Sequence, residues 1–323
     1  MSSFMKTYGK ALFTLVLIAI LIVFAGPLGL KIKNATTEKV STTEEIGNDE
    51  VYVTTTGRPK RPKEAVDKVW CYLDKNEELV ISQNKITAHN DAIVKEKQVS
   101  KPKDIISDTT QIKTVRFDGA VMPKSCDLWF NSCANLTEIK NIENLYTNEC
   151  TSMSCMFYNC SKLKEINLNN FDTSKVQYAI YMFYNCSSLT NINLQSFDTS
   201  NMTEISGMFC GCKNLTEINI CNFDTSKCNN MFDMFGNCTN LRKINLSSFN
   251  TTNVTNMWHM FYGCKNLSTL DLSNFDISNV TSLTEMFSIS NKLTSVKVSQ
   301  ATYDKLKTVS NLGITMDKFD IVK

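Results

Sequence analysis

Residues 260–280 decide the fold, and they read MFYGCKNLSTLDLSNFDISNV. The Met-Phe pair that opens this stretch recurs every 26 residues. The six pairs begin at Met156, Met182, Met208, Met234, Met260 and Met286. Two other columns keep the same step, namely Cys160, Cys186, Cys212, Cys238 and Cys264, and Phe171, Phe197, Phe223, Phe249 and Phe275. A constant period of this size is typical of a solenoid, in which each coil buries its apolar face against its neighbours.

Each period divides into a strand-like half and a helix-like half. Residues 267–275 follow the pattern L-x-x-L-x-L-x-x-F, which is close to the strand half of a leucine-rich repeat. The other half spaces its apolar residues three and four apart, as in Val254, Met257, Met260, Phe261 and Cys264. The polar residues Thr251, Thr252 and Asn253 precede them and suit a helix start. The sequence therefore predicts an α/β solenoid, a leucine-rich-repeat-like stack of about seven coils, each a short parallel strand plus a short helix.

Composition divides the chain into five segments. We expect a signal anchor or signal peptide over residues 1–30, a disordered stalk over 31–63, a small β-rich N-terminal cap over 64–128, the solenoid over 129–300 and a C-terminal cap over 301–323. The stalk is rich in Thr, Glu and Lys and buries too little to order itself. Strand-like runs at 69–73, 79–81 and 112–117 indicate the N-terminal cap, and a polar helix at 301–310 opens the C-terminal one.

The N-terminal apolar run has two interpretations. Residues 11–30 contain no charge and are flanked by Lys6, Lys10, Lys31 and Lys33. Twenty such residues are enough to span a bilayer as a helix. The tripeptide at 23–25 also suits signal-peptide cleavage after a basic start and an apolar core. In both cases the residues beyond Lys31 are expected outside the cytoplasmic membrane.

The repeated string quoted above, together with residues 112–117 and 129–133, resembles the BspA-type leucine-rich-repeat surface proteins, also described as mycoplasma-lipoprotein-associated repeats. The likeness covers roughly residues 69–298. It implies an exported, non-catalytic surface protein that binds host matrix or neighbouring-cell proteins. The chain differs from that pattern in showing no evident C-terminal wall anchor, so membrane attachment would depend on the N-terminal segment.

Composition excludes several kinds of chemistry. Lys and Arg total 34 against 32 Asp and Glu, so the chain has no strong positive field suited to nucleic acid. The only histidines, His89 and His259, indicate neither a catalytic dyad nor a metal cluster. We therefore predict no catalytic residue, no cofactor and no metal.

Two columns leave alternatives open. The five cysteines from Cys160 to Cys264 suit a buried ladder of free thiols, with disulfides or a metal as alternatives. Cys155 and Cys210 lie in columns that elsewhere hold Tyr, Gly, Asp or His, so we expect them to be more exposed. A turn column contains Asp172, Asp198, Asp224, Asn250 and Asp276, which would either lock the turn or bind Ca²⁺.

The outward positions of the strand half form the predicted ligand-binding site. Alternation along each strand turns them away from the core. The hypothesised site consists of Glu165, Asn167, Asn193, Glu217, Asn219, Lys243 and Asn245. Solenoids present extended surfaces of this kind to proteins, so we expect a surface module that binds proteins. A structural spacer without a ligand, or an enzyme or enzyme inhibitor, is the alternative, and an aromatic stripe at Tyr158, Tyr184 and Tyr262 is the competing surface.

Overall fold

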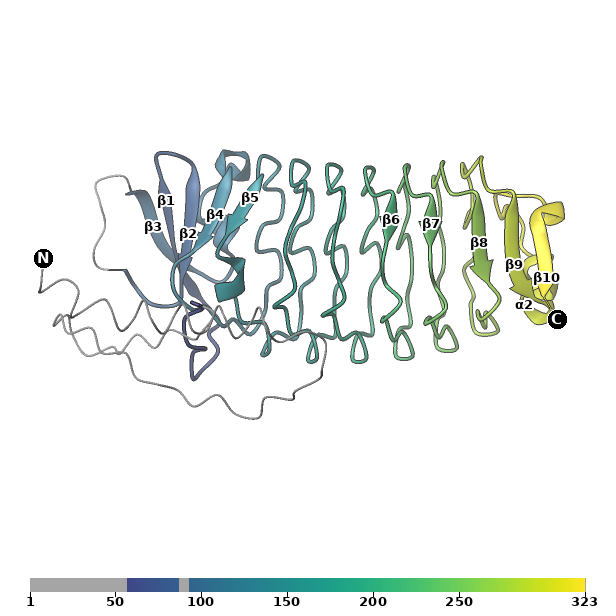
Figure 1. Cartoon of the computed structure of the whole chain (residues 1–323), viewed down its shortest axis with the longest axis horizontal. Helices are drawn as coiled ribbons and strands as arrows, with labels where there is room; N and C mark the ends of the chain where they lie inside the picture. Colours follow the sequence, from purple (N-terminus) through teal and green to yellow (C-terminus); the bar gives the residue numbers. More distant parts are fainter. Residues whose placement is uncertain (1–56, 87–92, 323) are drawn as a thin grey trace, which may run out of the picture. The chain divides into compact units, whose positions relative to one another are not determined.

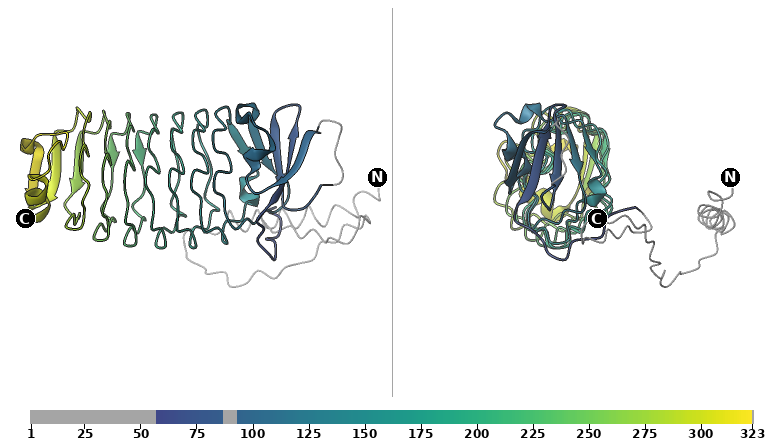
Figure 2. Two further views of the ribbon diagram at one scale, coloured as in Figure 1. Left: turned by 180° about the vertical axis from the view of Figure 1, so that it is seen from behind. Right: turned by 90° about the vertical axis from the view of Figure 1, so that its left-hand side faces the viewer.

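The computed structural model describes residues 57–86 and 93–322. The predicted signal or anchor segment and most of the predicted stalk lie outside these ranges. Among the helices of the described ranges, none has the length and apolarity that a membrane crossing requires. The described residues belong to one compact unit, a parallel β-solenoid of about eight turns of about 26 residues with little helix (Figure 1). Seen end-on, the successive coils superimpose (Figure 2).

Parallel strands run along one long side of the coils, which we call the sheet face. Its strands are β5 (Glu138–Lys140), β6 (Glu217–Ile218), β7 (Lys243–Ile244), β8 (Thr269–Leu272), β9 (Ser295–Ser299) and β10 (Phe319–Val322). The pairs β6–β7 and β8–β9 keep a register of one repeat, so Glu217 lies beside Lys243 and Thr269 beside Ser295. Asn193 and Asn219 form a bridge in the same register. The predicted parallel strand is confirmed in the coils that contain these elements, whereas residues 163–168 form no strand and residues 189–194 only the bridge at Asn193.

The opposite long side of the coils, which we call the turn face, contains turns where helices were predicted, so that prediction was wrong. Each coil enters it through a single bridge, in the column Ser152, Tyr178, Glu204, Asn230, Asn256 and Ser282. Consecutive turns follow instead of a helix. In one coil the amides of Met231, Asp233 and Phe235 donate to carbonyls of the next coil at 2.9–3.0 Å. The amides between them bond within their own coil: Phe232 donates to Asn230 Oδ1 at 3.0 Å, and Met234 to the carbonyl of Met231 at 3.3 Å.

Left-handed backbone explains why these turns imitate a helical pattern. Asp233 and Asn237 have φ of 55° and 57°, and the same two positions are left-handed in neighbouring coils. Two successive turns of four residues place apolar side chains three and four apart, as a helix does. An α-helix would use its amides internally and leave none for the next coil. The only α-helix of the described residues is α2 (Gln300–Leu306), which Ser299 caps by accepting from the Thr302 amide at 3.2 Å.

Polar turns close each coil between the two faces. Asp198 accepts from the amide and hydroxyl of Ser200 at 3.0 and 2.6 Å, and these hydrogen bonds hold the pKa of Asp198 below its usual value. Buried threonines beside this column donate to the next coil at 2.8–3.0 Å; they are Thr147, Thr173, Thr199, Thr225 and Thr251. The acidic column is therefore a turn lock, and Thr251 belongs to this turn rather than to a helix start.

The core consists of side chains stacked on their own kind. The phenylalanines from Phe157 to Phe287 stack with ring centroids 5.5–6.1 Å apart. The second predicted column, Phe171, Phe197, Phe223, Phe249 and Phe275, is at most 3% exposed. Each such side chain is worth about 1.5–3 kcal/mol when fully buried. Each coil buries these side chains against its neighbours. An isolated coil would leave them exposed to solvent and would not fold.

The N-terminal part adds a five-stranded sheet in the order β3-β1-β2-β4-β5. It contains β1 (Val69–Asp74), β2 (Glu78–Ser82), β3 (Ile93–Val99) and β4 (Thr114–Phe117). The runs read as strands from the sequence correspond to β1, β2 and β4, whereas β3 was not predicted. Because β4 pairs in parallel with both β2 and β5, this sheet continues into the coils. Four 3₁₀ helices complete the described elements, η1 (Pro102–Ile105), η2 (Thr109–Gln111), η3 (Ile142–Asn144) and η4 (Met316–Lys318).

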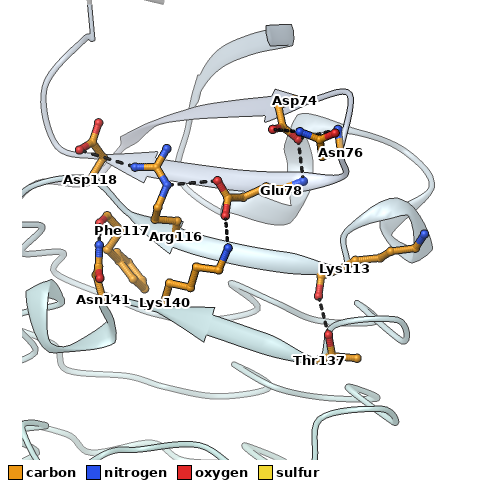
Figure 3. A network of polar contacts seen from close by, with 10 residues as sticks. All are labelled: Asp74, Asn76, Glu78, Lys113, Arg116, Phe117, Asp118, Thr137, Lys140 and Asn141. Atoms are coloured by element: carbon orange, nitrogen blue, oxygen red, sulfur yellow. Dashed lines mark hydrogen bonds and ion pairs between the residues drawn. The ribbon is translucent and has the colours of Figure 1, made fainter. Parts of the chain in front are cut away.

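A charged network fastens this sheet on its outer side (Figure 3). The Glu78 carboxylate accepts from Arg116 at 3.1 Å and from Lys140 at 2.9 Å, which connects β2, β4 and β5. Partial burial would raise the pKa of Glu78, but the hydrogen bonds with Lys140 and Arg116 outweigh it and leave this pKa below its usual value. The three strands therefore share one carboxylate, and that carboxylate stays ionised.

The predicted cysteine column is a ladder of buried free thiols. Its five members are at most 1% exposed. Each Sγ donates to the carbonyl of a phenylalanine one coil earlier at 3.1 Å, as Cys212 does to Phe183 and Cys238 to Phe209. In the last coil Ser290 occupies this column and donates to Phe261 at 2.7 Å. The column therefore needs a small donor rather than sulfur chemistry.

We predict that Cys212→Ser will be tolerated, because Ser290 already makes the same bond in its own coil. Cys212→Ala should lower the free energy of unfolding by about 1 kcal/mol, since it removes one hydrogen-bond donor and leaves a small cavity. Cys212→Asp should unfold the neighbouring coils, because its charge would be buried without a partner. Denaturant midpoints of the three variants check this order, and an Asp variant as stable as the Ser variant would contradict it.

Candidate functional site

The sheet face is hollowed into two shallow grooves. The first has a volume of about 520 Å³ and is lined by Glu165, Asn167 and Asn193 together with residues of β5. The second has a volume of about 660 Å³ and is lined by Glu217, Asn219, Lys243 and Asn245, together with Thr269 and Asp271 of β8. All seven predicted site residues are exposed, and each lines one of these grooves. Asn191 lines both, so the grooves adjoin.

The floor and walls of the grooves differ in character. Isoleucines of the strand half form the floor, among them Ile192 and Ile218, which are 5% and 6% exposed. Amide and charged side chains stand on both sides of them. A ligand lying here would meet a narrow apolar strip between donors and acceptors. The two grooves together extend over six coils, about 24 Å at a strand spacing of about 4.8 Å.

The asparagines of the site have a structural role that the sequence analysis missed. Each of their Oδ1 atoms accepts from the backbone amide two residues later, at 3.1 Å for Asn193 and 3.0 Å for Asn245. Asp271 holds the same position and accepts from Ser273 at 3.0 Å. These residues therefore lock the turn that ends each strand half, and their Nδ2 groups are the part of the side chain that this lock leaves unused. A further contact ties Asn193 to Asn169, at 2.8 Å.

The charged residues of the site are free of such duties. Within the described residues no hydrogen bond or ion pair joins the side chain of Glu165, Glu217 or Lys243 to another group. Glu217 and Lys243 are direct neighbours in the β6–β7 register. One offers a negatively charged acceptor and the other a positively charged donor, and neither side chain stabilises the coil. They are therefore the positions most available to a ligand.

The competing aromatic surface lies on the turn face and is divided. Tyr158 and Tyr184 stack at 4.7 Å between ring centroids. Tyr262 lies apart from them, against His259 at 4.6 Å. Trp258 is 42% exposed and packs against His259 at 4.5 Å. Cys210 and Gly236 occupy the Tyr column between the two groups, so the stripe is interrupted.

The turn face also contains two polar pairs that sequence reasoning missed. His259 Nε2 lies 3.1 Å from Glu285 Oε2, one repeat further on. Cys210 Sγ donates to Asp233 at 3.0 Å. Burial raises the pKa of Asp233, although this hydrogen bond and the nearby His259 both act to lower it. The register of 26 residues was the signal, since it places residue 285 directly beside 259. Cys210 is 2% exposed, so its predicted exposure was wrong; Cys155 is half-buried, and the exposed thiol is that of Cys221.

The grooves offer donors, acceptors and charges for contact along their length. In the part of the chain that the structure describes, no group of three or more His, Cys, Asp or Glu side chains is placed to hold a metal. The grooves are wide and open, and both charges occur in the second of them. Such a surface suits an extended ligand that contacts several coils at once.

A family model described as "Mycoplasma protein of unknown function, DUF285" matches residues 124–244 and 182–300. The two matches together cover more than half of the chain. The chain belongs to the DUF285 family. A leucine-rich repeat protein from Eubacterium ventriosum with a solved crystal structure is similar to this DUF285 chain, with 18% identity and a TM-score of 0.31, over 80% of this chain and 95% of that one. No curated protein matches the chain.

Asn245 provides a test of the turn lock in this DUF285 protein. We predict that Asn245→Ala lowers the free energy of unfolding by about 1 kcal/mol, because the amide of Ser247 loses its acceptor. Asn245→Asp should leave stability nearly unchanged, since Asp271 makes the same bond in another coil. Denaturant unfolding of the two variants measures the difference. Equal stability of the Ala and Asp variants would show that the bond contributes nothing.

Proposed function

We propose that this DUF285 protein is an exported, non-catalytic surface module that binds another protein through the grooves of the sheet face. The observation that supports this most directly is that seven outward side chains from successive coils line two adjoining grooves. A protein ligand fits because the grooves are long and shallow, the first with acidic and amide side chains and the second with both charges, whereas small molecules prefer enclosed apolar pockets. The residues proposed to carry the contact energy are Glu165, Glu217 and Lys243, with the Nδ2 groups of the asparagines beside them.

The proposal also covers the class of surface protein, its ligand and its attachment to the cell. The repeats resemble the BspA-type surface proteins, whose members are implicated in adhesion, and the ligand would accordingly be a host matrix or neighbouring-cell protein. The apolar residues 11–30 would either anchor the chain in the membrane or be removed as a signal peptide. The segment 31–63 would then hold the coils away from the membrane surface as a stalk.

Location is tested by protease treatment of intact cells. We expect added protease to remove the repeat domain, because the basic residues before the apolar run should stay on the cytoplasmic side. A cytoplasmic protein followed in the same samples reports whether the cells remain closed. Protection of the repeats in intact cells, with loss only after lysis, rejects the exported topology.

Binding is tested with a charge exchange at the centre of the second groove. Proteins of the matrix and of neighbouring cells are first screened for saturable binding to the full chain, and the double variant Glu217→Lys, Lys243→Glu is then compared with the unchanged chain. We expect it to weaken binding at least tenfold, since it reverses two unpaired charges. Thermal unfolding should not change, because exposed substitutions usually alter stability by no more than about 0.5 kcal/mol.

The matched controls lie away from the grooves. Lys265→Glu changes an exposed charge outside both grooves, and Trp258→Ala removes the most exposed ring of the turn face after Tyr178. Both variants should bind as the unchanged chain does. If Trp258→Ala abolishes binding while the charge exchange does not, the turn face is the functional one. If no tested protein binds saturably, the chain acts as a spacer and the binding proposal fails.

A further inference from the structure

Two cysteines outside the ladder face each other where the N-terminal sheet meets the first complete coils. The Sγ atoms of Cys126 and Cys150 are 3.4 Å apart, and both side chains are fully buried. Both cysteines are free thiols in this structure. They lie 24 residues apart in sequence, on neighbouring turns of the solenoid. No other pair of cysteine sulfurs within the described residues is recorded in such contact.

Backbone hydrogen bonds on both sides fix this pair in place. The Thr151 amide donates to Lys124 at 3.1 Å, and the Cys126 amide donates to Ser152 at 3.0 Å. The two chain segments are therefore held side by side, at the spacing of about 4.8 Å that separates neighbouring strands, and the two sulfurs meet across this gap. The side chains already point at one another, so bond formation needs only a small approach of the two sulfurs.

The surroundings of this pair differ from those of the thiol ladder. Each ladder cysteine contacts only a backbone carbonyl, and serine replaces cysteine in the last rung. Cys150 also donates to a carbonyl, that of Pro123 at 3.2 Å, but its sulfur contacts a second thiol as well. Cys126 and Cys150 instead occupy columns that hold bulkier apolar residues in most other coils. The column of Cys126 continues with Met153, Ala179, Ile205, Met231, Met257 and Leu283, and that of Cys150 with Val176, Met202, Cys228, Val254 and Val280. Cys126 and Cys150 are the first members of their columns, next to the N-terminal sheet. At this end of the solenoid, cysteine therefore occupies both of two contacting positions.

We propose that Cys126 and Cys150 form a disulfide when the chain folds in an oxidising compartment. The oxidant is a donor disulfide, either oxidised glutathione or the active disulfide of an exchange protein. One cysteine thiolate attacks the donor disulfide, forms a mixed disulfide and releases one donor thiol. The second thiolate then attacks the cysteine sulfur of the mixed disulfide and releases the other donor thiol. Two electrons pass to the donor, and the two protons lost by the cysteines end on its thiols.

Burial decides when the bond can form. The pKa of Cys126 is held well above its usual value by desolvation, and next by the bond with Cys150, so the folded protein offers little thiolate. The exchange therefore takes place while the first coil is still open. The resulting bond joins the first coil to the second, where the solenoid passes into its N-terminal sheet. End coils have a neighbour on one side only, so a covalent link there opposes fraying.

The test is refolding of the full chain from denaturant, once with a glutathione redox buffer and once with dithiothreitol. Free thiols are alkylated in denaturant, and the chain is digested with trypsin and chymotrypsin. Cleavage after Trp129 and Phe130 separates Cys126 from Cys133, and tandem fragmentation distinguishes Cys150 from Cys155. We expect a predominant Cys126–Cys150 cross-linked peptide in the redox buffer, with the five ladder cysteines alkylated.

Two variants make the result specific. Cys126→Ser should eliminate the cross-link, whereas Cys160→Ser, in the ladder, should leave it intact. The oxidised chain should unfold several degrees higher than the reduced one, and this difference should vanish in Cys126→Ser. The comparison of oxidised and reduced unchanged chain stands even if a variant fails to fold. Alkylation of both Cys126 and Cys150 after refolding in the redox buffer, or equal cross-linking of the ladder cysteines, overturns the proposal.

Discussion

The hydrogen bonds between coils on the turn face are the constraint on which this molecule depends. Every second backbone amide of that segment donates to a carbonyl of the next coil, as the amide of Phe235 does to Met260 at 3.0 Å. The backbone can alternate in this way only if some residues adopt left-handed φ. Tyr181, His259 and Glu285 do so at 53–60° although their side chains are bulky. Such a conformation costs about 1–2 kcal/mol per residue, and the bonds to the neighbouring coil offset it.

Fixed register between coils determines what each column can contain. A residue lies beside its counterpart one repeat away, so any side chain must be compatible with a near copy of itself. Phenylalanine satisfies this by stacking, and threonine by donating to the next carbonyl. Cysteine satisfies it by pointing at a carbonyl instead of at the next thiol. Where the contact between two thiols does occur, between Cys126 and Cys150, the partners come from different columns. The column in which a residue lies therefore determines which contacts its side chain can make.

The period, the buried columns and the strand half could be predicted from the sequence because each depends on spacing alone. The predicted helices failed because Met231, Met234, Phe235 and Cys238 have the same spacing in two successive turns as on a helix. Composition held the distinguishing signal. In the five middle coils the second left-handed position is occupied by Asn159, Asn185, Gly211, Asn237 and Gly263, residue types that tolerate positive φ, whereas Ser132 and Ile289 occupy it in the first and last coils. Regular recurrence of Asn or Gly inside an apparent helix therefore indicates a turn, since both residues are poor helix formers.

The same reasoning separates the residues of the candidate site into two classes. The column Asn167, Asn193, Asn219, Asn245 and Asp271 is nearly uniform because its oxygen must accept from the backbone amide two residues later. The neighbouring column Glu165, Asn191, Glu217, Lys243 and Thr269 changes charge and size from coil to coil, and its exposed side chains are under no comparable constraint. A surface that recognises a ligand must vary along its length to fix the ligand in one register. The uniform column repeats the same groups in every coil and cannot do this, whereas the variable column can. Specificity of the sheet face would therefore reside mainly in Glu165, Glu217 and Lys243, with the asparagines holding the turns that present them.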